Sequence, residues 1–488
     1  MRKGTELKRW LCAPGVSCAL LAASAAAWSS GRASAGDCAV GAGTRLIAPD
    51  LAPFDLFGQA VAIDGDTMVV GAWNDETPVV SGSAYVYQRQ SGVWQFVTKL
   101  LPPDGAAFDR FGWSVDIDAD TIAIGADSDD APQSDRGSVY VYVRVAGAWQ
   151  FQQKLTALGG IGGDRLGTSV SVKGDTLIAG APGNDEQGPN AGGAFVFVRS
   201  GAVWTEEALL SDPNAIGGEN LGAAVAVDGD LALAGANLSD VAGANAGAVI
   251  PFSRSAGVWT PEAPLSAAPL LSAGDQFGIS LALSGDAAIV GAPFSNAGGT
   301  DTGRAFFYRR TSGAWVLIDT LRSPTPANND QFGISVALSA DAAVVGLLFG
   351  DTGGVDSGGA MVFLREENVF AFSGALSAPE VSTVDQFGIS VAISADAIAV
   401  GANQDDAGAA NCGAAFVFAL NCGGLPGDMN CDGVVSVGDI SGFVLALTDP
   451  AGYAAAFPSC DINNADVNND TIVSVGDIGP FVQLLTGG

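Results

Sequence analysis

The chain has 488 residues, a formal net charge of −31 and no histidine. Its acidic balance argues against binding to nucleic acid or to an anionic membrane, since both surfaces attract basic patches. The absence of histidine excludes Ser/His/Asp and Cys/His nucleophile systems and the histidine-containing zinc sites. Paired carboxylates remain available for glycoside cleavage, so an enzyme is disfavoured but not excluded.

Residues 1–35 have the pattern of a secretory signal peptide. A basic start that includes Arg2 is followed by an apolar, alanine-rich run from Leu11 to Trp28, and Ala33-Ser34-Ala35 fits a cleavage site. A membrane anchor is the alternative, but the run is short for a spanning helix and contains Pro14. We therefore expect a secreted, extracellular or cell-surface protein, with no membrane span in the rest of the chain.

A repeat with a period of 54 to 56 residues occupies most of the chain, and its seven copies align on a glycine that follows an aromatic residue or leucine: Gly58, Gly112, Gly167, Gly222, Gly278, Gly333 and Gly388. An acid lies three residues before each glycine: Asp55, Asp109, Asp164, Glu219, Asp275, Asp330 and Asp385. An aspartate lies eight residues after it: Asp66, Asp120, Asp175, Asp230, Asp286, Asp341 and Asp396. A second glycine lies thirteen after it: Gly71, Gly125, Gly180, Gly235, Gly291, Gly346 and Gly401. Such regularity indicates one structural unit repeated seven times.

Each copy predicts four short strands. Val61 and Ile63 share one face of a first strand, and Asp64-Gly65 forms a two-residue turn into the second strand. A glycine- and aspartate-rich loop leads to an alternating aromatic third strand, such as residues 84–87, and a fourth strand carries Trp94 or its equivalent. Four strands in each of seven copies predict an all-β, seven-bladed β-propeller.

The two ends of the repeat region favour a closed ring over a linear β-solenoid. The seventh copy stops after its third strand, at residues 415–418, whereas residues 44–50 resemble the end of a fourth strand. The N-terminal segment near Leu46 is thus predicted to complete the last blade, which has no counterpart in a linear stack.

The repeated side chains have both a structural and a functional reading. The Asp66 series is expected to cap hairpins by accepting backbone N–H bonds, and the Asp55 series is either structural or a cation-binding ring. The loops at residues 127–130 and 403–406 are either a ligand surface or solvated connections. The Trp94 series is expected to pack between blades rather than to stack on sugars.

The run Asp55-Leu56-Phe57-Gly58, with Gly65-Asp66 and Val69-Val70-Gly71-Ala72, resembles the FG-GAP repeat of integrin α-subunit propellers and their bacterial relatives. The resemblance covers residues 44–420 and implies a seven-bladed propeller used for adhesion and ligand binding. Many FG-GAP repeats hold calcium in a loop between the first two strands. Here that loop is only a two-residue turn, so we do not expect calcium in the blades.

Beyond a short linker at residues 423–427, two segments have the ligand spacing of EF-hand calcium loops. The first oxygen set is Asp428, Asn430, Asp432, the carbonyl of Val434, Ser436 and Asp439. The second is Asp466, Asn468, Asp470, the carbonyl of Ile472, Ser474 and Asp477, with Thr471 in place of the usual glycine. Each loop precedes an apolar, helix-like stretch. An acidic linker with chance spacing is the alternative, but two matching copies favour two calcium ions.

This small α-helical tail, residues 428–488, resembles a type I dockerin. Dockerins bind cohesin domains and assemble secreted polysaccharide-degrading complexes, so the resemblance implies a cohesin-like protein partner. The tail departs from the family at the recognition positions, which are Val437-Gly438 and Val475-Gly476. The identity of the partner therefore does not carry over.

Five cysteines follow residue 35: Cys38, Cys412, Cys422, Cys431 and Cys460. Export permits disulfides, and with an odd count one thiol is left over or pairs between molecules. Cys38 precedes the predicted closing strand, and two other cysteines flank the last blade's third strand. We predict a disulfide from Cys38 to Cys412 or Cys422, and Cys431 is a candidate partner for Cys460.

Together these features predict a propeller over residues 36–422 and a calcium-ordered tail, without catalytic residues. The expected function is a secreted, non-enzymatic binding or adhesion scaffold that uses the propeller for a glycan or surface ligand and the tail for protein docking. A secreted polysaccharide-degrading enzyme, or an accessory component of such a complex, is one alternative. An architectural cell-surface protein is another.

Overall fold

The structure is a computed structural model, and it describes residues 38–486 apart from short gaps. The gaps are residues 77–79, 91, 131–132, 367–368, 379–383, 407, 423–426, 431–434, 458–459, 461 and 468–472. The predicted signal peptide lies outside the described residues. The chain forms two compact units, one spanning Ser34–Gly424 and one containing Leu425–Gly488.

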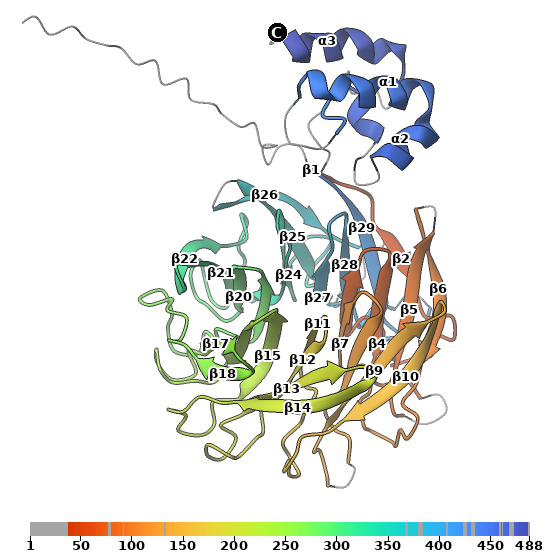
Figure 1. Cartoon of the computed structure of the whole chain (residues 1–488). Helices are drawn as coiled ribbons and strands as arrows, with labels where there is room; N and C mark the ends of the chain where they lie inside the picture. Colours follow the sequence, from red (N-terminus) through yellow and green to blue (C-terminus); the bar gives the residue numbers. More distant parts are fainter. Residues whose placement is uncertain are drawn as a thin grey trace, which may run out of the picture. The chain divides into compact units, whose positions relative to one another are not determined.

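The first unit is a seven-bladed β-propeller, and Figure 1 shows its sheets arranged in a ring. Blade one contains β3 (Ala60–Asp64), β4 (Thr67–Ala72), β5 (Ser83–Gln90) and β6 (Val93–Leu100). Blade two contains β7 (Ser114–Asp118), β8 (Thr121–Ala126), β9 (Ser138–Val145) and β10 (Ala148–Leu155). Blade three contains β11 (Val170–Lys173), β12 (Thr176–Ala181), β13 (Gly193–Ser200) and β14 (Val203–Leu210). Blade four contains β15 (Leu221–Asp228), β16 (Leu231–Ala236), β17 (Ala248–Ser255) and β18 (Val258–Pro261).

The remaining blades follow the same antiparallel order. Blade five contains β19 (Ser280–Ser284), β20 (Ala287–Ala292), β21 (Arg304–Thr311) and β22 (Ala314–Leu321). Blade six contains β23 (Phe332–Leu338), β24 (Ala342–Leu347), β25 (Gly359–Glu366) and β26 (Val369–Leu376). Blade seven contains β27 (Phe387–Ile393), β28 (Ala397–Ala402) and β29 (Ala414–Cys422), joined by β1 (Cys38–Val40) and β2 (Thr44–Leu46). The fold class predicted from the repeat is confirmed for this unit.

The core consists of apolar layers between neighbouring blades. Strand β4 is buried along its whole length, which explains its nearly continuous apolar sequence. Between blades one and two, for example, Val69 and Val86 pack with Phe111 and Tyr140 in one cluster. Each blade is therefore stabilised mainly by its two neighbours, so the ring must close for every apolar face to be covered.

The two repeated glycines allow neighbouring blades to approach closely. A Cβ atom at Gly71 would lie 2.0 Å from the carbonyl oxygen of Gly112, the aligning glycine of the next blade. Gly112 itself has a φ of +90°, which disfavours other residues. The last contact of this series joins Gly401 to Gly58 and so connects blade seven to blade one.

The N-terminal segment occupies the fourth-strand position of blade seven. Strand β2 pairs antiparallel with β29, with Leu46 opposite Ala415, and β1 continues along the same strand. Figure 1 shows these two strands beside β29. A bridge from Phe57 to Gly413 repeats at this junction the link found between the other blades. The ends of the propeller sequence thus meet in one blade.

The second unit is small and helical. It contains η2 (Val437–Asp439), α1 (Ile440–Thr448), α2 (Pro450–Ala456), η3 (Ile462–Ala465), η4 (Val475–Asp477) and α3 (Ile478–Thr486). Phe443 and Phe481 stack with ring centroids 3.9 Å apart at the centre of its core. No helix in the described part of the chain has the length and hydropathy that a bilayer crossing requires.

Candidate functional site

The propeller has two faces, which differ in the connections that they carry. The two-residue turns after the first strands lie on one face, here called the hairpin face. The longer connections after the second and fourth strands lie on the opposite face, here called the loop face, because the strands of each blade run antiparallel. Any ligand site on either face uses side chains that the blades do not need for their own structure.

The acids that precede the aligning glycines belong to the structure of the loops. The carboxylate of Asp55 accepts a hydrogen bond of 2.8 Å from the backbone N–H of Ala52, three residues earlier. The same bond recurs in other blades, for example from Ala106 to Asp109 at 2.6 Å. Burial raises the pKa of Asp55 and of Asp109 to about 6. The recurring backbone hydrogen bond supports the structural reading of this series.

The second acidic series does not cap hairpins, which corrects the expectation from sequence. The carboxylate of Asp66 accepts instead from Nε of Arg89 at 2.7 Å. The Arg89 guanidinium lies 5.5 Å from the ring centroid of Trp94. Blades two, three and four have the same stack: Asp120, Arg144 and Trp149; Asp175, Arg199 and Trp204; Asp230, Arg254 and Trp259. The repeated tryptophans therefore pair with arginines on the hairpin side, which supports their structural role.

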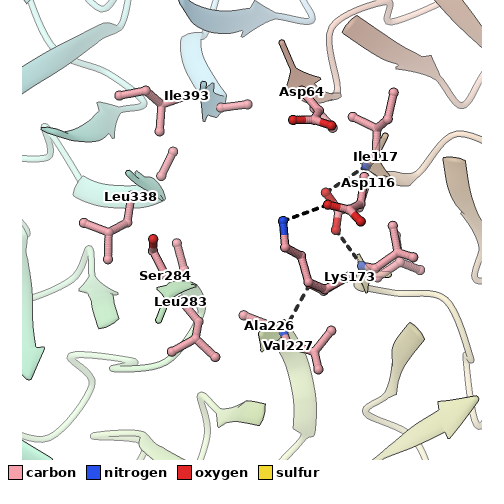
Figure 2. A pocket seen from close by; sticks show the side chains of 18 of the residues that line it. Asp64, Asp116, Ile117, Lys173, Ala226, Val227, Leu283, Ser284, Leu338 and Ile393 are labelled. Carbon is pink, nitrogen blue, oxygen red and sulfur yellow. Dashed lines mark hydrogen bonds and ion pairs between the residues drawn. The ribbon is translucent and has the colours of Figure 1, made fainter. Parts of the chain in front are cut away.

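The central channel is a cavity with a volume of about 400 Å³. It is lined by the first strand of every blade, and most of its surface is aliphatic. Figure 2 shows Lys173 reaching into it from β11, with Asp116 and Asp64 on the neighbouring strands. The charged groups that line it come from blades one to four, and Ser284 lines it at the hairpin end of blade five.

The charged groups of the channel join adjacent blades. Nζ of Lys173 donates to Asp118 at 2.7 Å, and the same carboxylate accepts from the backbone N–H of Gly174 at 2.8 Å. Asp64 accepts from the N–H of Ala119 in the next blade at 2.7 Å. Asp228 accepts from Gly285 in the same way at 2.6 Å. These contacts use the channel carboxylates as links between first strands.

Asp116 is a channel acid that the sequence analysis did not single out, as are Asp118 and Asp228. The two carboxylate oxygens of Asp116 accept from the N–H groups of Ile117, at 2.9 Å, and of Val172, at 2.7 Å. Burial is the main cause that raises its pKa to about 7. The signal was present in the sequence, because five blades have alanine at this point of the repeat and blade three has Ser171. A carboxyl group held by two backbone donors links blades but is poorly placed to transfer protons to a substrate.

In the first predicted calcium loop, the side chain of Asp439 accepts hydrogen bonds from backbone groups of the same loop. It is fully buried, and its carboxylate accepts from the N–H groups of Met429, Asn430 and Ser436 at 2.7, 3.0 and 2.8 Å. Asp428, the first ligand of the set, is 2% exposed. The carboxylate of Asp439 therefore faces the start of its loop.

The second loop has the same local geometry. The carboxylate of Asp477 accepts from the N–H of Ser474 at 2.9 Å, and the Ser474 hydroxyl accepts from Gly476. Predicted ligands Asp432, Val434, Asn468, Asp470 and Ile472 lie outside the described residues. No cluster of three acidic or cysteine side chains suited to a metal occurs among the residues that are described. The donors at Asp428, Asn430, Asp439, Asp466 and Asp477 are oxygens, which fits a hard cation such as calcium.

The two halves of the tail expose equivalent apolar side chains. Val437 and Val475, at equivalent points of the two predicted loops, are each 79% exposed. The helices continue the pattern, with Ile440 and Val444 exposed on α1 and their equivalents exposed on α3. We call this set the apolar stripes: Val437, Ile440 and Val444 in one half, and Val475, Ile478 and Val482 in the other. Large exposed apolar groups that recur in two copies mark an interaction surface better than scattered ones.

The positions of the cysteines separate the predicted disulfide pairings from one another. Cys412 is a buried free thiol, so the predicted pairing of Cys38 with Cys412 is wrong. Cys38 lies directly opposite Cys422 in the register of β1 and β29, which leaves that alternative as the prediction. Cys460 is disulfide-bonded, and its candidate partner Cys431 lies outside the described residues.

The comparisons with known proteins agree with the repeat geometry. A family model described as FG-GAP repeat matches seven segments, residues 41–87, 94–142, 149–197, 204–250, 259–308, 315–363 and 372–418. Each segment begins in or near a fourth strand and ends within the third strand of the next blade. No curated protein matches the chain.

Proposed function

Because the chain belongs to the FG-GAP repeat family, we propose that it is a secreted, non-enzymatic binding scaffold with a calcium-ordered docking tail. The propeller binds a ligand or surface, and the tail attaches the protein to a partner. The observation that carries the proposal is the pair of exposed apolar stripes on the tail, next to two loops with calcium-ligand spacing.

The propeller supports a binding role rather than catalysis. Its recurring acids accept backbone or arginine hydrogen bonds, and the channel carboxylates link neighbouring blades. Groups that are held in this way stabilise a rigid ring, and rigid rings present variable loops to ligands. FG-GAP propellers fit this use as binding scaffolds in general.

In the proposed function, the two loops of the tail each bind one calcium ion through oxygen ligands. The oxygens of Asp428, Asn430 and Asp439 hold one ion, and those of Asp466 and Asp477 help to hold the other. Bound calcium neutralises carboxylates that otherwise repel one another and fixes each loop against the helix that follows it. The loops then hold Val437 and Val475 in position for a partner with an apolar docking surface.

The test uses the full secreted chain, loaded with calcium, on an array of secreted proteins and glycans. Replacing both Val437 and Val475 with aspartate should weaken protein binding by about tenfold or more, since central apolar anchors dominate interfaces. The matched control is Val258→Asp, which changes a 62% exposed valine of the propeller and should leave docking unchanged. Equal docking by all three proteins would contradict the proposed role of the tail.

The same material tests the absence of catalysis. Bound glycans recovered after long incubation should keep their original chain length when analysed by chromatography. Progressive shortening by the purified protein would favour the alternative, a secreted polysaccharide-degrading enzyme.

A further inference from the structure

A cavity on the loop face, between blades one and two, has features that the repeat does not require. Its volume is about 360 Å³, and its walls include Trp73 and Asn74 from the loop after β4, Phe108 and Arg110 from the loop before β7, and Asp135 from the loop after β8. Three separate connections therefore meet around one space. We call it the aromatic cavity.

Two residues of the wall, Trp73 and Arg110, contact a second tryptophan, Trp113, which is not among the lining residues. The rings of Trp73 and Trp113 lie edge to face, with centroids 5.7 Å apart. The Arg110 guanidinium lies 5.2 Å from the first ring and 5.1 Å from the second. The carboxylate of Asp127, which is fully buried, forms an ion pair with Arg110 at 3.7 Å and also pairs with Arg165. The wall is thus fixed before any ligand arrives.

Trp73 and Trp113 do not belong to the repeat pattern, because the other blades have other residues at the equivalent positions. The tryptophans of the fourth strands recur from blade to blade, but at the point of Trp113 the last three blades all have isoleucine. At the point of Trp73 the other blades have aspartate, proline, asparagine or leucine. The fold therefore does not need a tryptophan at either place.

The exposed position and the backbone conformation of Phe108 are both unfavourable for a bulky apolar residue. Its side chain is 70% exposed and its φ is +75°, a left-handed conformation that disfavours bulky residues. At the same point of the repeat, blades three, four and five have glycine, including Gly163. Phe54 in blade one repeats the arrangement, with φ of +68° and 53% exposure, and its carbonyl accepts from Asn74 at 2.8 Å. Strain of this kind at an exposed aromatic residue points to function.

We propose that the aromatic cavity binds a neutral oligosaccharide. An anionic ligand would meet Asp135 and a cationic one would meet Arg110, so a neutral ligand is favoured. Asn74 and Ser128 offer both donors and acceptors, which match hydroxyl groups. The exposed face of Phe108 suits the apolar face of a sugar ring, since aromatic side chains combine large apolar contact with little loss of side-chain freedom.

This inference names the ligand class of the proposed binding function and rests on that function. The test titrates the full, calcium-loaded chain with cellohexaose, mannohexaose and maltohexaose, using hexagalacturonate as the acidic comparison. Phe108→Gly installs the residue that blades three to five use, so the fold should be as stable as before or more so. Trp113→Ile installs the residue of blades five to seven. The matched control, Val384→Gly, makes the same kind of change in blade seven, where Val384 has a φ of +72°.

At least one neutral hexasaccharide should bind in calorimetry, and Phe108→Gly and Trp113→Ile should each weaken its Kd by about tenfold or more. Val384→Gly should bind like the unchanged chain, and thermal melts should show all variants folded. The inference is overturned if no neutral hexasaccharide binds, if hexagalacturonate binds more tightly, or if the two cavity variants bind as well as the control. The proposed scaffold function survives those outcomes if the array still shows docking through the tail or a protein ligand for the propeller.

Discussion

Closure of the ring by the N-terminal segment makes a quantitative prediction about Leu46. This residue lies 54 positions before Leu100, the last residue of the fourth strand of blade one, and the two are 7% and 4% exposed. Leu46 packs in one apolar cluster with Phe57, Tyr85 and Val417. If β2 is a full fourth strand, replacement of Leu46 by alanine should cost as much as the same change at Leu100.

The expected cost follows from burial. Removing a buried leucine side chain to its Cβ typically costs about 2–5 kcal/mol, because contacts are lost and a cavity remains. Deleting residues 36–50 should cost more, since it also removes Arg45 from the buried carboxylate of Asp405 and takes away hydrogen-bond acceptors of Tyr85 and Tyr87. Loss of one partner of a buried ion pair alone costs about 3–5 kcal/mol.

The assay is urea unfolding followed by tryptophan fluorescence, with thermal melts for the deletion. Leu158→Ala sets the baseline, because that side chain is 73% exposed and its replacement should change stability by less than about 0.5 kcal/mol. The closure argument is refuted if Leu46→Ala behaves like Leu158→Ala while Leu100→Ala carries the full cost. An unchanged melting curve for the deletion would refute it as well.

Three further predictions concern the metal, a disulfide and the channel. The double substitution Asp432→Ala plus Asp470→Ala should abolish the uptake of two calcium ions in titration calorimetry. It should leave the melting temperature of the propeller unchanged. Calcium uptake that survives both substitutions would show that the ions bind elsewhere. Peptide mapping without reduction should find Cys38 joined to Cys422, because opposite residues of paired strands lie within disulfide range, and a free Cys38 would exclude this link. The raised pKa of Asp116 means that the folded protein keeps a proton between about pH 4 and 7 that the unfolded chain has lost, so its contribution favours folding as pH falls through that window. Asp116→Ser, which installs the residue of blade three, should reduce the slope of stability against pH by up to about 1.4 kcal/mol per pH unit, and an unchanged slope would show that the carboxyl does not titrate there.

Local pattern was enough to predict several parts of the structure. The two-residue turns and the alternating strands are set by neighbours in the chain, so residues such as Asp64-Gly65 could be placed from sequence. The match of residues 44–50 to a fourth strand identified the segment that pairs with β29. The predicted hairpin cap at Asp66 was wrong because its partner, Arg89, lies on the third strand, and no local rule brings that arginine to the turn.

The sequence by itself determined the number of blades, their strand order and the segment that closes the ring, because each blade repeats one local pattern and the count follows from the period. Only the tertiary structure decided which side chains of different blades meet. Asp116 reaches Val172 across the channel wall, and Arg110 lies against Trp73 on the loop face, because blade packing joins residues that are far apart in the chain. Contacts of this kind depend on the position of two sheets relative to each other, which a period of about 55 residues does not encode.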